Sequence, residues 1–233
     1  MQIFYAPDLN GTFYTLSEEE SKHCIRVLRL NQGDNITLVD GKGGLYQTRI
    51  TDTNPKKCRV EVYQSYQNYQ KRSFSLHVAI APTKNIERFE WFLEKATEIG
   101  VDEITPLLCE HSERKVINAE RLNKIIISAM KQSVKAFLPK LNELTTIHQF
   151  CDRYSDPSKF IAHCHSSNLI PIKNKIIKGQ NITILIGPEG DFSSVEIVEA
   201  KNAGFTEVSL GNSRLRTETA GIVACTISNS INE

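Results

Sequence analysis

The sequence lacks several features that would assign it to common classes. No apolar run approaches the ~20 residues that a membrane-spanning helix needs. The first fourteen residues, MQIFYAPDLNGTFY, contain neither a basic segment nor a long apolar stretch, so we expect no secretory signal. Cysteine is sparse and scattered, with no Cys-x-x-Cys pair among positions 24, 58, 109, 151, 164 and 225. We therefore expect reduced thiols and a cytoplasmic protein rather than a disulfide framework or a zinc knuckle.

The chain also has no large excess of positive or negative charge. The 233 residues contain 28 Lys and Arg against 27 Asp and Glu, a net charge of +1. The whole chain is not a polycation, so any nucleic-acid surface must come from local clustering of basic residues. Hydrophobic residues make up 40% and charged residues 24%, which is typical of one large or two smaller globular domains.

The first ~70 residues read as a β-rich unit. Strands are predicted at 35–39, 45–50 and 58–63, with the turn Asp40-Gly41-Lys42-Gly43-Gly44 between the first two. Ser17-x-x-Glu20 is a capping box and predicts a helix from Glu18 to about Arg29. The polar segment YQSYQNYQKRS (63–73) has no periodicity, and we place a domain boundary there.

After this boundary, strands alternate with helices, which indicates an α/β domain with a parallel sheet. The predicted strands are 75–81, 103–107, 159–164, 181–186 and 207–210. Apolar periodicity predicts helices over 86–99 and from about 119 to 130, the second with a possible cap at Asn118. Ser193-x-x-Glu196 starts another helix, and a last one is predicted from Thr217 to about Ser230.

Two unusual loops follow two of these strands. Gly187-Pro188-Glu189-Gly190-Asp191 leaves the end of the apolar strand 181–186, and SLGNSRLRTETAG (209–221) follows the next strand. Ligands of parallel α/β sheets bind outside the carboxyl ends of strands, so both loops point to one site. Neither contains a phosphate-binding Gly-Lys-Ser/Thr or Gly-x-Gly-x-x-Gly motif, and Glu189 and Asp191 would repel a phosphate. An adenosine that carries a cationic sulfonium fits; the alternative is that both loops are simply tight turns.

Five ordered segments resemble the ribosomal RNA small subunit methyltransferase E family within the SPOUT class. They are HCIRVLRLNQGD (23–34), EKATEIGVDEITPL (94–107), AMKQSVKAFLP (129–139), IGPEGDFS (186–193) and LGNSRLRTETA (210–220). The resemblance implies a PUA-like β-barrel over residues 1–72 and a SPOUT methyltransferase domain with a trefoil knot over 73–233. It also implies bound S-adenosyl-L-methionine (SAM), a homodimer, and methylation of N3 of a uridine in the decoding region of 16S rRNA. Departures from the family stand at Asp191, often a second glycine, and at His111 and Lys135, where arginine is frequent.

The resemblance and the loop positions together give the candidate site residues. We expect cofactor contacts from residues of the two loops and of one neighbouring strand end: His165, Ile186, Gly187, Pro188, Glu189, Gly190, Leu210, Gly211, Leu215, Arg216, Thr217 and Glu218. Arg214 and Arg216 are the candidates for stabilising charge on the target base. Glu98 is a further catalytic candidate, because a carboxylate near the carboxyl end of a helix is disfavoured by the helix dipole. Each arginine could instead pair with Glu189 or Glu218, and Glu98 could form a surface salt bridge.

RNA contacts are predicted from local charge. Residues 111–140 contain seven Lys and Arg against two Glu, and several of the cations recur at helical spacing. The predicted RNA-binding residues are Ser112, Arg114, Lys115, Arg121, Lys124, Lys131, Gln132 and Lys135, with His23, Arg26 and Arg29 in the first domain. A solvated helix face is the alternative.

Two rival functions remain, and a metal site is not expected. His163 and His165 would project the same way from a strand, but no third ligand is near in sequence, so His165 is assigned to the SAM pocket. The rivals are a non-catalytic PUA-like module that binds structured RNA, and an α/β enzyme acting on a small metabolite. The first would not need two glycine loops, and the second would not need the basic helix.

Overall fold

The computed structural model describes residues 2–153, 158–166 and 168–233. It divides into two compact units, one formed by Met1–Lys71 with Ile127–Leu138 and the other by Arg72–Ile126 with Pro139–Glu233. The predicted boundary after residue 72 stays a prediction. The return of 127–138 to the first unit was not anticipated. Within the described residues no helix is long and apolar enough to cross a membrane.

The first unit contains a five-stranded sheet in the order β1-β3-β4-β5-β2. The strands are β1 (Ile3–Tyr5), β2 (Phe13–Thr15), β3 (Asn35–Val39), β4 (Leu45–Asp52) and β5 (Arg59–Tyr66). All pairs are antiparallel except β1 with β3. The core packs Phe4, Leu38, Ile50 and Val60 together, each almost fully buried. The three longer strands match the predicted ones, whereas the three-residue strands β1 and β2 are too short to give a periodic signal.

The predicted helix from Glu18 to Arg29 is not continuous. α1 (Glu18–Lys22) starts where expected, with the hydroxyl of Ser17 accepting a hydrogen bond from the N–H of Glu20, but it passes into a π-helical turn, η1 (His23–Val27). The N–H of Leu28 then donates to the carbonyl of His23, and Arg29 adopts a φ of 56°. A left-handed residue cannot continue a right-handed helix, so the prediction was too long.

The segment 127–138 belongs to the first unit because its apolar side chains complete that unit's core. Met130 and Ala136 are buried with Val39 and Leu45. This segment also contacts the turn between β3 and β4, where the N–H of Gly43 donates a hydrogen bond to the carbonyl of Ala136 at 2.9 Å. A Cβ on Gly43 would lie 2.4 Å from the ring of Phe137, so glycine is required for this approach.

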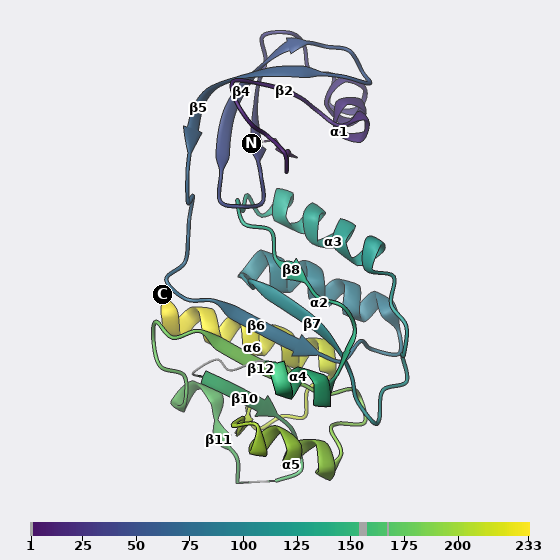
Figure 1. Ribbon diagram of the computed structural model, residues 1–233, viewed down its shortest axis with the longest axis vertical. Helices are drawn as coiled ribbons and strands as arrows, with labels where there is room; N and C mark the ends of the chain where they lie inside the picture. The colour runs from purple at the N-terminus through teal and green to yellow at the C-terminus, as the bar shows by residue number, and fades with distance from the viewer. Residues whose placement is uncertain (1, 154–157, 167) are drawn as a thin grey trace. The chain divides into compact units, whose positions relative to one another are not determined.

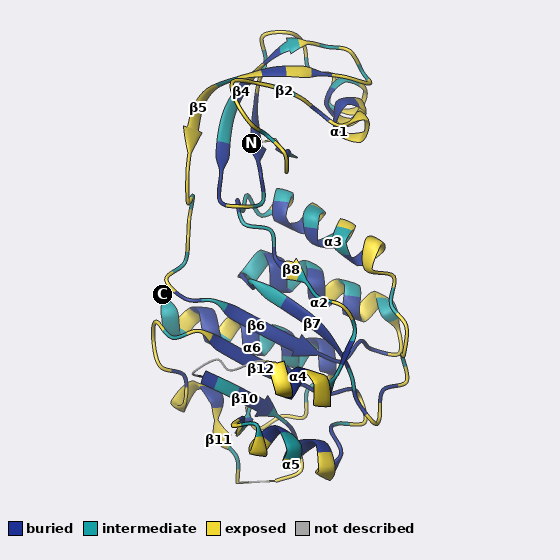
Figure 2. Cartoon of the chain, in the orientation of Figure 1, coloured by how far each residue is buried: buried dark blue, intermediate teal, exposed yellow. Residues whose placement is uncertain are grey.

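The second unit is built on a parallel sheet in the order β11-β13-β10-β12-β6-β7-β8, with β9 paired to β7. Its strands are β6 (Leu76–Ile80), β7 (Glu103–Leu108), β8 (Lys140–Leu141), β9 (Thr145–Thr146), β10 (Ser158–Ala162), β11 (Ile170–Pro171), β12 (Ile182–Ile186) and β13 (Thr206–Ser209). All five predicted strands are present. β12 lies between β10 and β6 and all five of its residues are buried, as an apolar central strand should be (Figure 2).

Helices cover both faces of this sheet (Figure 1). α2 (Ile86–Ile99) and α6 (Thr217–Asn232) lie on one face, and α4 (Ile147–Arg153) and α5 (Ser194–Asn202) lie on the other. The described residues also form α3 (Ala119–Gln132), whose second half belongs to the first unit, and a short 3₁₀ turn, η2 (Ile172–Asn174). α4 and α5 bury Phe150 and Ile197 in a cluster with Ala79 and Leu185. On the opposite face α2 packs against α6, and Gly221 of α6 lies where a Cβ would meet Phe92 at 2.5 Å and Ile80 at 2.9 Å.

Candidate active site

The carboxyl ends of β10, β12 and β13 meet at one edge of the sheet, and a cavity of about 340 Å³ opens there. We call it the strand-end cavity. Three loops line it, one after each strand, together with the first turn of α6. The lining residues are Ala162, His163, Cys164, Ile186, Gly187, Pro188, Glu189, Asp191, Ser209, Leu210, Gly211, Ser213, Arg214, Leu215, Arg216, Thr217 and Ala220.

Most of the cofactor-binding prediction falls on this cavity. Nine of the predicted residues line it: Ile186, Gly187, Pro188, Glu189, Leu210, Gly211, Leu215, Arg216 and Thr217. His165, Gly190 and Glu218 do not. His163 and Cys164, which follow β10, line the cavity instead of His165, although the same strand end was expected to contribute to the pocket.

Hydrogen bonds fix both ends of the loop 187–191, which we call the glycine loop. Thr217, buried at the start of α6, donates a hydrogen bond from its hydroxyl to the carbonyl of Gly187 at 3.1 Å. The N–H of Asp191 donates to the carbonyl of Pro188 at 2.9 Å and closes the turn. The carboxylate of Glu189 accepts the N–H of Lys84 at 3.0 Å, which ties the loop to the segment after β6. The loop is therefore fixed before any ligand binds.

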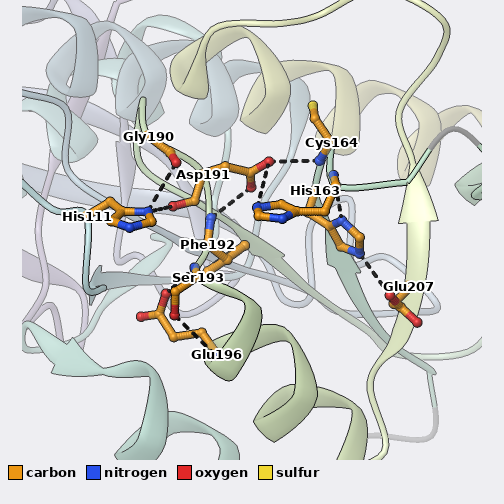
Figure 3. Close-up of polar contacts among 10 residues, drawn as sticks. His111, His163, Cys164, Gly190, Asp191, Phe192, Ser193, Glu196 and Glu207 are labelled. Carbon is orange, nitrogen blue, oxygen red and sulfur yellow. Dashed lines mark hydrogen bonds and ion pairs between the residues drawn. The ribbon is translucent and has the colours of Figure 1, made fainter.

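Asp191 connects two loops (Figure 3). Its Oδ2 accepts the N–H of Cys164 at 2.8 Å, and its Oδ1 accepts the N–H of Phe192 at the same distance. Its φ of 63° lies in the left-handed region, which Asp tolerates better than most residues because its side chain can bond the nearby backbone. The carboxylate that was expected only to repel phosphate thus has a structural role.

Gly190 does not border the cavity as predicted. A Cβ placed on it would lie 3.0 Å from Cβ of His111, so the missing side chain makes room for the histidine. Nδ1 of His111 lies 3.2 Å from the carbonyl oxygen of Gly190 and 3.0 Å from that of Asp191. Because both neighbours are acceptors, Nδ1 carries the proton and donates. His111 stands where arginine is frequent in the resembling family.

His163 and His165 follow β10 and are not part of it, so strand alternation does not apply to them. Nδ1 of His163 accepts the N–H of His165 at 3.1 Å, and its Nε2 lies 3.2 Å from Oε1 of Glu207. Nε2 is therefore the protonated nitrogen. A hydrogen bond from Lys201 is the main reason why the pKa of Glu207 is lowered, with His163 contributing. Among the residues that the structure describes, no three His, Cys, Asp or Glu side chains gather as a metal site.

Two of the three catalytic candidates lie at the cavity, and the third does not. Arg214 and Arg216 both line the cavity and are exposed, and in the described part of the chain no carboxylate lies within 4.0 Å of either guanidinium. The alternative pairing with Glu189 or Glu218 is therefore not observed. Glu98 was wrongly expected at the site: it lies in the last turn of α2, paired with Lys95 at 2.9 Å. The first turns of α2 are the part of the helix nearest the cavity, whereas Glu98 lies in the last turn, at the opposite end.

The cavity wall also offers free backbone donors. Within the described residues, the amide N–H groups of 211–216 have no protein acceptor. Gly211 has a φ of 139° and nothing within 4 Å of where a Cβ would be. Backbone groups left open in a cavity suit a ligand with several hydrogen-bond acceptors, such as a nucleoside. The carboxylates of Glu189 and Asp191 favour a ligand that also carries positive charge.

The predicted RNA-binding helix face is largely neutralised. Arg121 pairs with Glu90 at 2.7 Å, Lys124 with Glu120 at 2.7 Å, and Lys131 with Glu20 at 2.7 Å. Lys135 lies beyond the end of α3 at Gln132, after a left-handed Val134, so it does not extend the helical row as predicted.

The remaining RNA-binding candidates divide into structural and exposed residues. Ser112 is buried and its hydroxyl accepts the N–H of Cys109, while the guanidinium of Arg114 donates to the carbonyls of Thr83 and Lys84. The exposed candidates are Lys115, Gln132, His23, Arg26 and Arg29. In the described chain Lys115, Arg26 and Arg29 have no ion-pair partner.

Comparisons with known proteins agree with this geometry. The model of the RNA methyltransferase domain family matches residues 70–229, and that of the RNA methyltransferase PUA domain matches 16–63. The chain is 30% identical over 233 residues to ribosomal RNA small subunit methyltransferase E of Buchnera aphidicola, covering 97% of this chain and 91% of that protein.

Several solved structures resemble the whole chain, and two of them illustrate the similarity. A probable rRNA-methyltransferase from Porphyromonas gingivalis is 42% identical with a TM-score of 0.93, over 100% of this chain and 98% of that one. A ribosomal RNA small subunit methyltransferase E from Neisseria gonorrhoeae, bound to S-adenosyl methionine, is 27% identical with a TM-score of 0.88 over the same shares. The cavity at the strand ends, the PUA domain match and the whole-length similarity have one common explanation: the chain belongs to the ribosomal RNA small subunit methyltransferase E family.

Proposed function

We propose that the protein transfers a methyl group from SAM to N3 of a uridine in the decoding region of 16S rRNA. The observation that carries this proposal is the strand-end cavity, whose lining combines Glu189 and Asp191 with a segment, 211–216, whose backbone N–H groups have no acceptor in the described chain. Those groups fit a nucleoside that carries a cationic sulfonium, and the Neisseria relative holds SAM. Neither rival function has a comparable observation in its favour.

The residues of the cavity would hold SAM through backbone and apolar contacts. Ile186, Leu210 and Leu215 supply apolar surface, and the amides of 211–216 supply donors. When bound, SAM supplies an electrophilic methyl group on a sulfonium. The chain fixes the loops so that donor and acceptor can be aligned, which is a large part of the acceleration of a displacement. Arg214 and Arg216, exposed and without ion-pair partners, would stabilise negative charge on the uracil oxygens as N3 loses its proton.

The same proposal includes the assembly and the cellular setting. We expect a homodimer in the cytoplasm, where its rRNA substrate is made, and a trefoil knot in the second unit, as the family resemblance implies. The exposed side of α6 supports a subunit contact, because Ile222, Val223 and Ile227 are only half-buried within one chain. Sedimentation at micromolar concentration should give the dimer mass; a stable monomer would contradict this part of the proposal.

Labelled methyl transfer tests the function. The protein should transfer tritium from methyl-labelled SAM to small-subunit rRNA, and digestion of the RNA should yield 3-methyluridine at one position. Naked 16S rRNA and assembled small subunits are compared as substrates. SAM binding without transfer to either would leave the chain a binding module, and transfer to a free nucleoside would favour the metabolite enzyme.

A further inference from the structure

A second depression adjoins the strand-end cavity. It has a volume of about 640 Å³ and lies between the first turns of α2 and α6, and we call it the α2–α6 groove. Its lining is Asn85, Glu87, Arg88 and Trp91 with Arg214, Leu215, Arg216, Glu218 and Thr219. The three residues 214–216 line both spaces. A molecule in the groove would therefore meet a molecule in the cavity across this short segment.

Trp91 is unusually exposed for a large aromatic residue in a helix. The neighbouring Phe89, Phe92 and Leu93 are completely buried, whereas 44% of Trp91 is exposed. It is also the only tryptophan of the chain. A large indole left open in a groove among three arginines is a stacking surface of the kind that single-stranded nucleic acids use, since every base has a π-face.

One carboxylate oxygen of Glu218 has no hydrogen-bond partner in the described chain. Only 7% of the residue is exposed, and among the described residues its Oε2 has no hydrogen-bond donor. The nearest cation is Arg88, whose Nε lies 4.0 Å from Oε1, too far for a direct hydrogen bond. A buried carboxylate without a donor is costly, and such a group in a native structure calls for an explanation. The sequence had assigned Glu218 to the cofactor, but the structure places it in the groove.

The groove lining combines one acceptor with two donor side chains. The carboxylate of Glu218 is the acceptor, and the guanidinium groups of Arg88 and Arg216 line the groove with it. The imide edge of uracil has the complementary groups, with the N3–H donor between two carbonyl oxygens. Cytosine does not match, because its N3 carries no hydrogen.

We propose that the α2–α6 groove is the subsite for the target uridine, with Trp91 as the stacking surface and Glu218 as the acceptor for N3–H. This rests on the proposed function. In the reaction the N3–H bond breaks, its proton passes to the carboxylate of Glu218, and the N3 electron pair forms the new bond to the methyl carbon. The bond between that carbon and sulfur breaks, and its electron pair stays on sulfur, which becomes a neutral thioether. Arg88 and Arg216 offset the charge on the two carbonyl oxygens.

The single tryptophan makes the binding step directly measurable. Fluorescence of the full chain is titrated with a short oligouridylate in the presence of S-adenosylhomocysteine, which cannot donate a methyl group. Oligouridylate should quench Trp91, and oligocytidylate should bind about tenfold more weakly. S-adenosylhomocysteine alone should leave the emission almost unchanged. Strong quenching by S-adenosylhomocysteine, with none from oligouridylate, would assign the groove to the cofactor and overturn the proposal.

Variants separate stacking from proton transfer. Trp91→Ala should weaken oligouridylate binding about tenfold, and Trp91→Phe should retain most of the affinity. Glu218→Gln keeps the shape but not the proton acceptor, so the single-turnover rate with saturating rRNA and SAM should fall about a hundredfold while SAM affinity holds. Lys173→Ala, which removes an exposed cation far along the chain from the groove residues, is the control for loss of charge.

The outcomes distinguish the groove from the overall function. If wild-type protein does not methylate rRNA but oligouridylate still quenches Trp91, the proposed reaction is wrong and the groove remains a uridine site. If the wild type methylates rRNA and both Trp91→Ala and Glu218→Gln do so at the same rate and with the same RNA affinity, the groove proposal is wrong and the reaction stands.

Discussion

The hydroxyl of Thr217 donates a hydrogen bond to the carbonyl oxygen of Gly187 at 3.1 Å. This contact joins the first residue of α6 to the first residue of the glycine loop, thirty positions earlier in the chain. Both residues line the strand-end cavity, and Thr217 is buried. The bond therefore fixes the distance between the two loops on which the cavity depends.

Replacing Thr217 by valine should remove this bond and leave the shape nearly unchanged. The carbonyl of Gly187 would lose its donor, and we expect a loss of about 1–3 kcal/mol in the free energy of unfolding, measured in urea. SAM affinity, measured by calorimetry, should fall as well. Thr217→Ser keeps the hydroxyl and is the matched control. Equal SAM affinity in the valine and serine variants would show that the bond does not shape the cavity.

Asp191 gives a second prediction, because its role as a hydrogen-bond acceptor can be separated from its tolerance of a left-handed φ. Asp191→Asn keeps an acceptor for the N–H of Cys164 and tolerates a left-handed φ, so it should cost about 1 kcal/mol or less of unfolding free energy. Asp191→Ala loses the acceptor and is strained at a φ of 63°, so it should cost about 2–4 kcal/mol. Urea unfolding of both variants measures the difference. Asp191→Gly relieves the strain alone and should lie between them; a glycine variant as stable as wild type would deny the carboxylate its structural role.

The sequence predicted most of the second unit because its elements follow from local patterns. The strand 182–186 consists of apolar and β-branched residues, which predicts a central position, and the capping box at Ser193 is formed as expected. Its two glycine loops were also correctly placed at one sheet edge, since parallel strands bring their carboxyl ends together. Short elements such as α4 and β11 were missed, because seven residues or fewer carry little periodicity.

The predicted cofactor residues that do not line the strand-end cavity show how far a side chain's direction depends on distant partners. Gly190 was assigned to the ligand, but the neighbour that needs its space is His111, 79 positions away. Glu218 was assigned to the cofactor, although the turn of α6 points it toward Arg88 of α2. Nothing in the sequence pattern shows which helix packs beside which, so the α2–α6 groove could not be predicted.

The contact between α4 and α5 should depend on pH. His148 of α4 is hydrogen-bonded to the carboxylate of Glu199 of α5, and this bond, with the charges of Glu199 and Asp152, raises the pKa of His148 above 6.5. A group whose pKa is raised on folding stabilises fully below its unfolded-state pKa, and this stabilisation disappears as pH rises through the folded-state pKa. Wild type should therefore exceed His148→Gln in stability at about pH 5 by more than at about pH 8. A constant difference in the urea midpoints across this range would contradict the ion pair.

RNA binding should rest on the exposed, unpaired cations rather than on the paired helix face. Arg26→Ala and Lys115→Ala each remove a cation that has no ion-pair partner in the described chain, so each should flatten the dependence of log K on log salt by about 1. Lys131→Ala should behave differently. Its amine is 2.7 Å from the nearly buried carboxylate of Glu20, and its loss should lower the free energy of unfolding by about 1–3 kcal/mol.

Measuring the three variants together distinguishes the cations without an ion-pair partner from the paired Lys131. Affinity for small-subunit rRNA is measured at several salt concentrations for all three variants, alongside their urea unfolding. Lys131→Ala should keep the wild-type salt slope, because its charge already balances Glu20 before RNA binds. If Lys131→Ala reduces the slope and Lys115→Ala does not, the phosphate contacts lie on the helix face after all, and the Glu20 pair must open when RNA binds.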